Sequence, residues 1–126
     1  MSVVKAARAR IKGSAAIMAK VKAVEANIIR DSSQFPAIYI AQAEMIKNHC
    51  YGGYMLRGNI EIGVYADTYA VAEEVIGLLR TLFDRHRETF EGMNITYNTG
   101  EEEADSYDDE VKKEVKVITF PVVATK

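Results

Sequence analysis

Cysteine, histidine and tryptophan are scarce in this chain. Its 126 residues include one cysteine, Cys50, two histidines and no tryptophan. A single cysteine excludes an internal disulfide and makes a reducing compartment the default expectation. No apolar run approaches the roughly 20 residues that a membrane-spanning helix needs. The formal net charge of −2 points to no particular partner.

The motifs that hold metals, phosphates or cofactors are also missing. The sequence has no C-x-x-C or H-E-x-x-H spacing and no glycine-rich phosphate loop. His49 and Cys50 combine a base with a nucleophile, but such pairs usually converge from separate elements. His86 falls on the apolar stripe of a predicted helix. We therefore predict no catalytic residue, no cofactor and no metal, and we expect a binding or structural protein.

The most regular stretch runs from Tyr54 to Arg87. Its first half alternates, with apolar residues on one parity and polar residues such as Arg57, Asn59 and Glu61 on the other. This period of two predicts a long strand with one buried face. Apolar residues then recur at steps of three and four, which predicts an amphipathic helix that reaches Arg87. Asp67 or Thr68 is placed to cap its start.

Shorter patterns predict the remaining elements. We expect helical turns over residues 2–11 and 15–21, and strands over 24–30, 37–44, 93–97 and 111–123. Short links between neighbouring strands favour antiparallel pairing. The sequence therefore predicts one α+β domain over residues 1–126: a two-layer fold with a mainly antiparallel sheet of about four to five strands and two helices packed on one face. Flexible loops are expected near 45–53 and 98–110, the first being either a mobile hairpin tip or an extension of the hairpin.

Charge is distributed unevenly along the chain. Residues 1–30 hold seven basic residues and one acidic residue, a formal charge of +6, whereas residues 91–110 hold eight acidic residues and no basic ones. One interpretation is two solvated surface segments. The other is a polar subunit whose basic and acidic ends attract each other head to tail.

The order of these segments resembles a known family. The strand Phe35-Pro36-Ala37-Ile38-Tyr39-Ile40 is followed by R-G-N-I-E-I-G-V-Y-A-D-T-Y, which leads into A-x-A-E-E-V-I-G-L-L-R-x-L-F. A polar segment and a last strand, V-K-V-I-T-F-P-V, complete the pattern. In this order and in size, the chain is similar to the tail-terminator and tail-completion (tail-to-head joining) proteins of long-tailed bacteriophages.

The resemblance implies a small subunit that forms a hexameric ring at the head-proximal end of the tail. Such a ring terminates tail-tube polymerisation and joins the tail to the head. Its partners would be further copies of itself, the tail-tube protein and a head-completion or connector protein, and genomic DNA would pass through the lumen without sequence recognition. The implied location is the virion tail or neck, assembled in the host cytoplasm, with no membrane partner and no catalytic residue to carry over.

Two groups of residues are the candidate interface. Arg57, Asn59, Glu61 and Tyr65 lie on the polar face of the long strand, which two layers would leave uncovered. The acidic segment adds the second group, which would face the lumen or a basic neighbouring ring: Glu101, Glu102, Glu103, Asp105, Asp108 and Asp109. Three alternatives stay open: another phage neck protein of the head-completion or stopper type, a small cellular module that binds a protein partner, and an enzyme subunit that completes its site across an interface.

Overall fold

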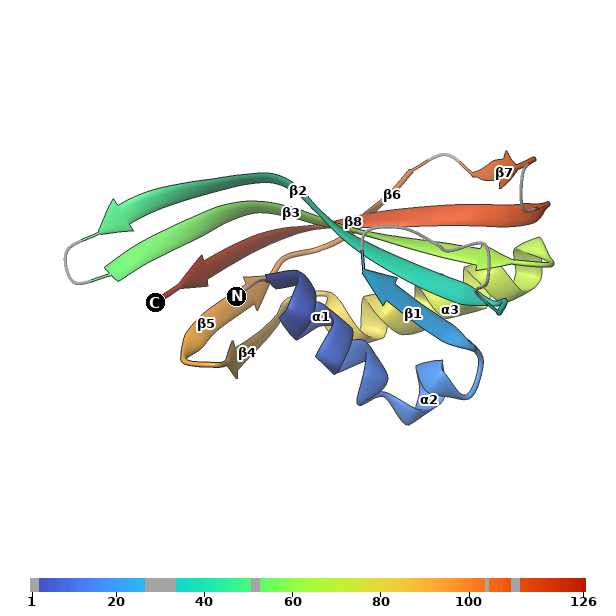
Figure 1. Cartoon of the computed structure of the whole chain (residues 1–126), viewed down its shortest axis with the longest axis horizontal. Coiled ribbons are helices and arrows are strands. Elements are labelled where there is room, and N and C mark those ends of the chain that lie inside the picture. Colours follow the sequence, from blue (N-terminus) through green and yellow to red (C-terminus); the bar gives the residue numbers. More distant parts are fainter. Residues whose placement is uncertain (1–2, 27–33, 51–52, 104, 110–111) are drawn as a thin grey trace.

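Three helices lie on one side of a curled sheet (Figure 1). The computed structural model describes residues 3–26, 34–50, 53–103, 105–109 and 112–126, without the side chains of 43–45, 48–50 and 54. The helices are α1 (Val3–Lys12), α2 (Ala15–Met18) and α3 (Tyr69–Phe83). The strands are β1 (Ala23–Ala26), β2 (Ala37–Cys50), β3 (Gly53–Ala66), β4 (His86–Phe90), β5 (Met93–Tyr97), β6 (Glu101–Glu102), β7 (Ser106–Asp108) and β8 (Lys113–Thr125).

The centre of the sheet is formed by β2, β3 and β8. The described strands follow the order β1-β2-β3-β8-β5-β4, and β6 and β7 also pair with β8. The α+β class and the helices on one side agree with the sequence prediction, but four to five strands is wrong, because the described residues alone form eight. The additional strands β4, β6 and β7 are short, and pairing with β5 (for β4) or with β8 (for β6 and β7), rather than any local pattern, makes them strands.

The β2–β3 hairpin is longer than its most regular sequence pattern. The two strands pair from Ala37↔Tyr65 to Cys50↔Gly53, with an irregularity between Ala43 and Ile46. Residues 45–50 are therefore strand, and the second of the two alternatives for this segment, an extension of the hairpin, is the one observed.

The pairing of the first strand differs from the antiparallel pairing that the sequence predicts. β1 pairs with β2 in parallel, with Ala23 opposite Ala37 and Ala26 opposite Ile40. In a parallel pair the chain must run back from the end of β1 to the start of β2. Because β1 has only four residues, this distance is only about 13 Å, which the ten residues 27–36 are long enough to span. The expected strand residues 27–30 and the turn at 31–33 lie outside the described residues.

The long helix begins as predicted and ends earlier. Thr68 caps α3 by accepting a hydrogen bond from Val71 N at 3.3 Å, while Asp67 pairs instead with Lys113. The helix ends at Phe83 rather than Arg87, so His86 is not on a helix stripe but is exposed at the start of β4. The link from β4 to β5 is the two-residue turn Glu91-Gly92, in which both residues have positive φ, as the favoured hairpin turns require.

The core lies between the helices and the inner face of the sheet. Alternate residues of β3, from Ile60 to Ala66, point inward as the sequence predicts. On β8 the inward parity is the even one, which includes Ile118, Phe120 and Val122, whereas Val117 and Val123 point outward. Phe83 of α3 packs edge-on against Tyr97 at 4.9 Å and against Phe120 at 5.3 Å. The helices and the sheet therefore share one continuous core.

Candidate functional site

The outer face of the sheet is the face opposite the helices. Arg57, Asn59, Glu61 and Tyr65 all lie on it, because they share the outward parity of β3. Their register partners on β8 are Val123, Pro121, Thr119 and Val115. Only Arg57 of the four is fully exposed, and the other three are half-buried. This face therefore mixes polar and apolar side chains and has partial cover.

The cover comes from the acidic segment and from Phe35. β7 pairs with β8 through Ser106↔Val115, so it lies at the edge of the outer face. The Phe35 ring lies 6.4 Å from the Tyr65 ring. The segment 98–110 thus contains the strands β6 and β7, whereas the sequence pattern indicated only a polar loop.

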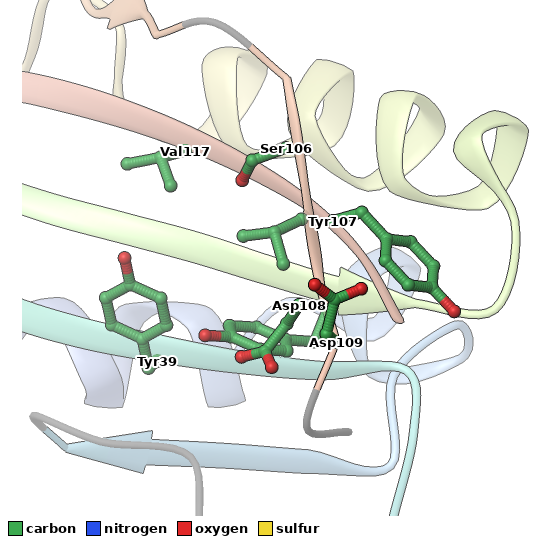
Figure 2. A pocket seen from close by; sticks show the side chains of 8 residues that line it. Tyr39, Ser106, Tyr107, Asp108, Asp109 and Val117 are labelled. Carbon is green, nitrogen blue, oxygen red and sulfur yellow. The ribbon is translucent and has the colours of Figure 1, made fainter. Parts of the chain in front are cut away.

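A hollow of about 700 Å³ opens between β7 and the outer face. It is lined by Tyr39, Tyr65, Ser106, Tyr107, Asp108, Asp109, Val115 and Val117; we call it the tyrosine pocket. Figure 2 shows Tyr39 on one side of the hollow and Asp108 and Asp109 on the β7 segment, while the Tyr107 ring points away from them. Aromatic rings, two valines and carboxylates therefore meet on one surface.

The tyrosines of this pocket are ordered by neighbouring carboxylates. Tyr39 Oη donates a hydrogen bond to Glu61 Oε2 at 3.3 Å, and the Tyr39 and Tyr65 rings meet edge-on at 5.9 Å. Burial and the Glu61 carboxylate raise the pKa of Tyr39 far above its usual value. Burial and the Asp108 carboxylate likewise raise the pKa of Tyr65. Both hydroxyls therefore stay protonated at neutral pH and act as hydrogen-bond donors, not as bases.

The Tyr39 ring packs directly on the backbone of Gly63. A Cβ atom added at Gly63 would lie only 1.9 Å from Tyr39 Cε1. Because glycine has no side chain, the Tyr39 ring can lie directly against the backbone at this position. Tyr39 belongs to the pocket, although the sequence analysis did not select it. Tyr39 could have been found only from the pairing register of β2 with β3, because pairing with Gly63 is what places Tyr39 beside Tyr65.

The other acidic residues turn away from the pocket. Lys116, whose side chain is 8% exposed, donates to Asp105 Oδ1 at 2.8 Å and to Tyr69 Oη at 3.3 Å. The Asp105 hydrogen bond raises the pKa of Lys116, and the same bond lowers the pKa of Asp105. Glu102 forms an ion pair with Arg80 of α3 at 3.1 Å. These contacts fasten the segment to α3 and β8.

The ten predicted interface residues consequently fall into four sets. Glu61, Tyr65, Asp108 and Asp109 come together in or beside the tyrosine pocket, whereas Asn59 and Arg57 lie further along the outer face. Glu102 and Asp105 belong to the ion-pair network on the helix side. Glu101 and Glu103 are exposed. The structure does not test whether any of these sets forms an interface.

Residues suited to chemistry are sparse in the part of the chain that the structure describes. No group of three His, Cys, Asp or Glu side chains there is arranged to hold a metal ion. The side chains of His49 and Cys50 lie outside the described set. No described helix has the length and apolar character needed to cross a bilayer. The tyrosine pocket combines aromatic, apolar and acidic side chains and is suited to binding.

Comparison with known proteins gives a fold likeness. No protein-family model and no curated protein sequence matches the chain. Among solved structures, a chain of the virion of a native gene transfer agent particle superposes with a TM-score of 0.59 at 11% identity, covering 99% of this chain and 98% of that one. A second structure, whose name describes no function, has a TM-score of 0.53 at 16% identity and covers 98% and 87%. At these identities the comparison establishes a shared fold.

Proposed function

We propose that this chain is a structural protein of a phage-like virion. In this proposal it forms a ring at the head-proximal end of the tail, terminates tail-tube polymerisation and joins the tail to the head. The observation that carries the proposal is the end-to-end fold likeness to a chain of a gene transfer agent virion. The segment order described above, which resembles tail-terminator proteins, supports the same role independently.

The position of α3 supports a terminator over another neck protein. A head-completion or stopper protein would be favoured by a barrel-like sheet without a long helix on it. Here α3, of 15 residues, packs against β3 and β8 and contributes Val75, Leu79 and Phe83 to the core. In the proposed ring, the partners are further copies of the chain, the tail-tube protein and a head-completion or connector protein, and DNA passes through the lumen.

Interruption of the gene in a particle-producing strain tests the role. The expected phenotype is tails of uncontrolled length or tails without heads, scored by electron microscopy of the lysate. Mass spectrometry of purified wild-type particles should detect the chain, and imaging of the neck should place it there. Normal head-tail particles from the interrupted strain, or absence of the chain from purified particles, would refute the proposal. Complementation with the wild-type gene is the control.

A narrower test addresses the exposed part of the acidic segment. Glu101 and Glu103 are exposed, so replacing both with glutamine changes the local charge by two while leaving Glu102 and Asp105 in their ion pairs. If this segment repels DNA in the lumen or meets a basic neighbouring ring, head-tail joining should fall. A control is Glu73→Gln with Glu74→Gln on the exposed face of α3. Equal joining by the two variants would exclude this role.

A further inference from the structure

The far end of the outer face carries an exposed cation beside an exposed aliphatic side chain. Ile46 of β2 is 60% exposed and pairs in register with the exposed Arg57 of β3. The hairpin continues past Met55, where pairing with β8 ends, and Figure 1 shows its end projecting beyond the helices. We call Ile46 and Arg57 the arm pair. Both side chains are exposed, so they are accessible to contact with another surface.

The tyrosine pocket offers the complementary chemistry at the opposite end of the same face. Its carboxylates, Asp108 and Asp109, can accept the forked hydrogen bonds of a guanidinium. Tyrosine rings attract a cation over their faces, and Val117 provides an apolar surface for an aliphatic neighbour. None of the eight lining residues carries a positive charge. An arginine accompanied by an apolar side chain is therefore the type of ligand that fits this pocket.

One chain cannot satisfy both features by itself. Arg57 and Tyr65 are eight positions apart on β3, which at about 3.3 Å per residue is roughly 26 Å. Both point outward from a continuous paired strand, so the arm pair cannot reach the tyrosine pocket of its own chain. A second copy whose outer face is turned toward the first can present its arm pair to that pocket.

We propose that the arm pair of one copy binds the tyrosine pocket of the next, with Arg57 against Asp108 and Asp109 and Ile46 against Val117. The contact is heterologous when the arm pair and the tyrosine pocket of one copy engage two different neighbours. Repetition of a heterologous contact closes a ring when its rotation permits. This inference deepens the proposed function and rests on it for the ring.

Charge reversal provides the test. Arg57 and Asp109 are both exposed, so Arg57→Glu and Asp109→Arg should preserve the fold, to be verified by circular dichroism. Each single variant places like charges in contact, and we expect self-association of the full chain, measured by sedimentation velocity, to weaken by about 10-fold or more. The matched controls are Lys12→Glu and Glu73→Arg, two exposed positions on the helices, which should associate like the wild type.

Mixing the two single variants gives the sharper result. In an alternating assembly, the acidic arm of Arg57→Glu meets the basic pocket of Asp109→Arg, and the unmodified arm meets the unmodified pocket. The mixture should therefore associate more tightly than either variant alone, and the chain carrying both substitutions should recover to within about 3-fold of the wild type. Failure of both the mixture and the double variant, or a wild type that stays monomeric, would overturn the inference.

These measurements are separable from the test of the proposed function. Association that responds to charge exchange, in a protein absent from purified particles, would refute the virion role and retain the contact. Normal neck incorporation with association that ignores the substitutions would refute the contact and retain the role.

Discussion

A single added methyl group at Gly63 should disturb the tyrosine pocket. The Gly63→Ala Cβ would lie 1.9 Å from Cε1 and 2.4 Å from Cζ of Tyr39, far inside van der Waals contact. The backbone of β3 is paired on both sides, so it is the half-buried Tyr39 ring that must move. Displacing the ring breaks its edge-on contact with Tyr65 at 5.9 Å and its hydrogen bond to Glu61 at 3.3 Å.

The expected loss follows from these two contacts. An aromatic pair contributes about 0.5–1.5 kcal/mol, and a long, half-exposed hydrogen bond about 0.5–1 kcal/mol. Replacing glycine with alanine within a strand returns about 0.5–1 kcal/mol, because alanine loses less conformational entropy on folding. Gly63→Ala should therefore lower the free energy of unfolding by about 0.5–1.5 kcal/mol.

The effect of Gly63→Ala on the free energy of unfolding should change sign when the Tyr39 ring is absent. The Tyr39→Ala background removes the three atoms nearest to the new methyl group, so Gly63→Ala should there stabilise by about 0.5–1 kcal/mol. Urea unfolding of the four chains, followed by far-ultraviolet circular dichroism, gives the coupling energy of the cycle. Gly77→Ala is the matched control, since no atom lies within 4 Å of its Cβ position. An equal effect of Gly63→Ala in both backgrounds would refute the reasoning.

Three further predictions concern the core, a cap and pH. Phe83→Ala removes a fully buried ring and should cost about 3–5 kcal/mol of unfolding free energy in the same urea assay. Thr68→Ala removes the side-chain acceptor at the start of α3 and should cost about 1 kcal/mol with an unchanged urea slope. Because the folded state raises the pKa of Tyr39, Tyr65 and Tyr97, whereas unfolded tyrosines ionise near pH 10, stability should fall as the pH rises above about 10. Absorbance at the tyrosinate band should show these three of the seven tyrosines ionising late, together with unfolding.

The parts of the fold that the sequence predicts are those with a local signal. The alternation from Leu56 to Ala66 and the three- and four-residue steps from Ala72 to Phe83 each record one buried face, and both are confirmed. In β8 the valines and the charged residues indicate the wrong buried face, because the outward positions include Val117 and Val123 and the inward positions include Lys116. When both faces of a strand carry apolar side chains, the alternation of the sequence does not identify which face is buried.

The missed elements depend on pairing between distant segments. β6 has only two residues, both glutamate, and is a strand because it lies against Ile118 and Thr119 of β8. His86 fits the helical stripe by spacing, yet Arg85 adopts positive φ and the chain leaves the helix before it. The backbone conformations of Asp84 (φ −55°, ψ 118°) and Arg85 (φ 56°), which the side-chain pattern does not encode, separate the two outcomes.

The candidate site was predicted in part for the same reason. The outward parity of β3 identified Glu61 and Tyr65, which do lie beside the pocket. The acidic residues that are close in sequence do not stay together in the structure, because Asp105 and Asp108 are three residues apart and face opposite sides of β8. Their separation follows from Lys116, which draws one carboxylate to the helix side.

The position of β8 determines how the sheet comes apart. This strand pairs with β3 along one edge and with β5, β6 and β7 along the other, so it alone joins the β1-β2-β3 half to the β5-β4 half among the described strands. Opening β8 releases all of these pairings together. In hydrogen exchange, the amides shared by β3 and β8 should thus be the last to exchange and should do so as a single cooperative unit, whereas amides near the end of the β2–β3 hairpin, which β8 does not pair with, should exchange first.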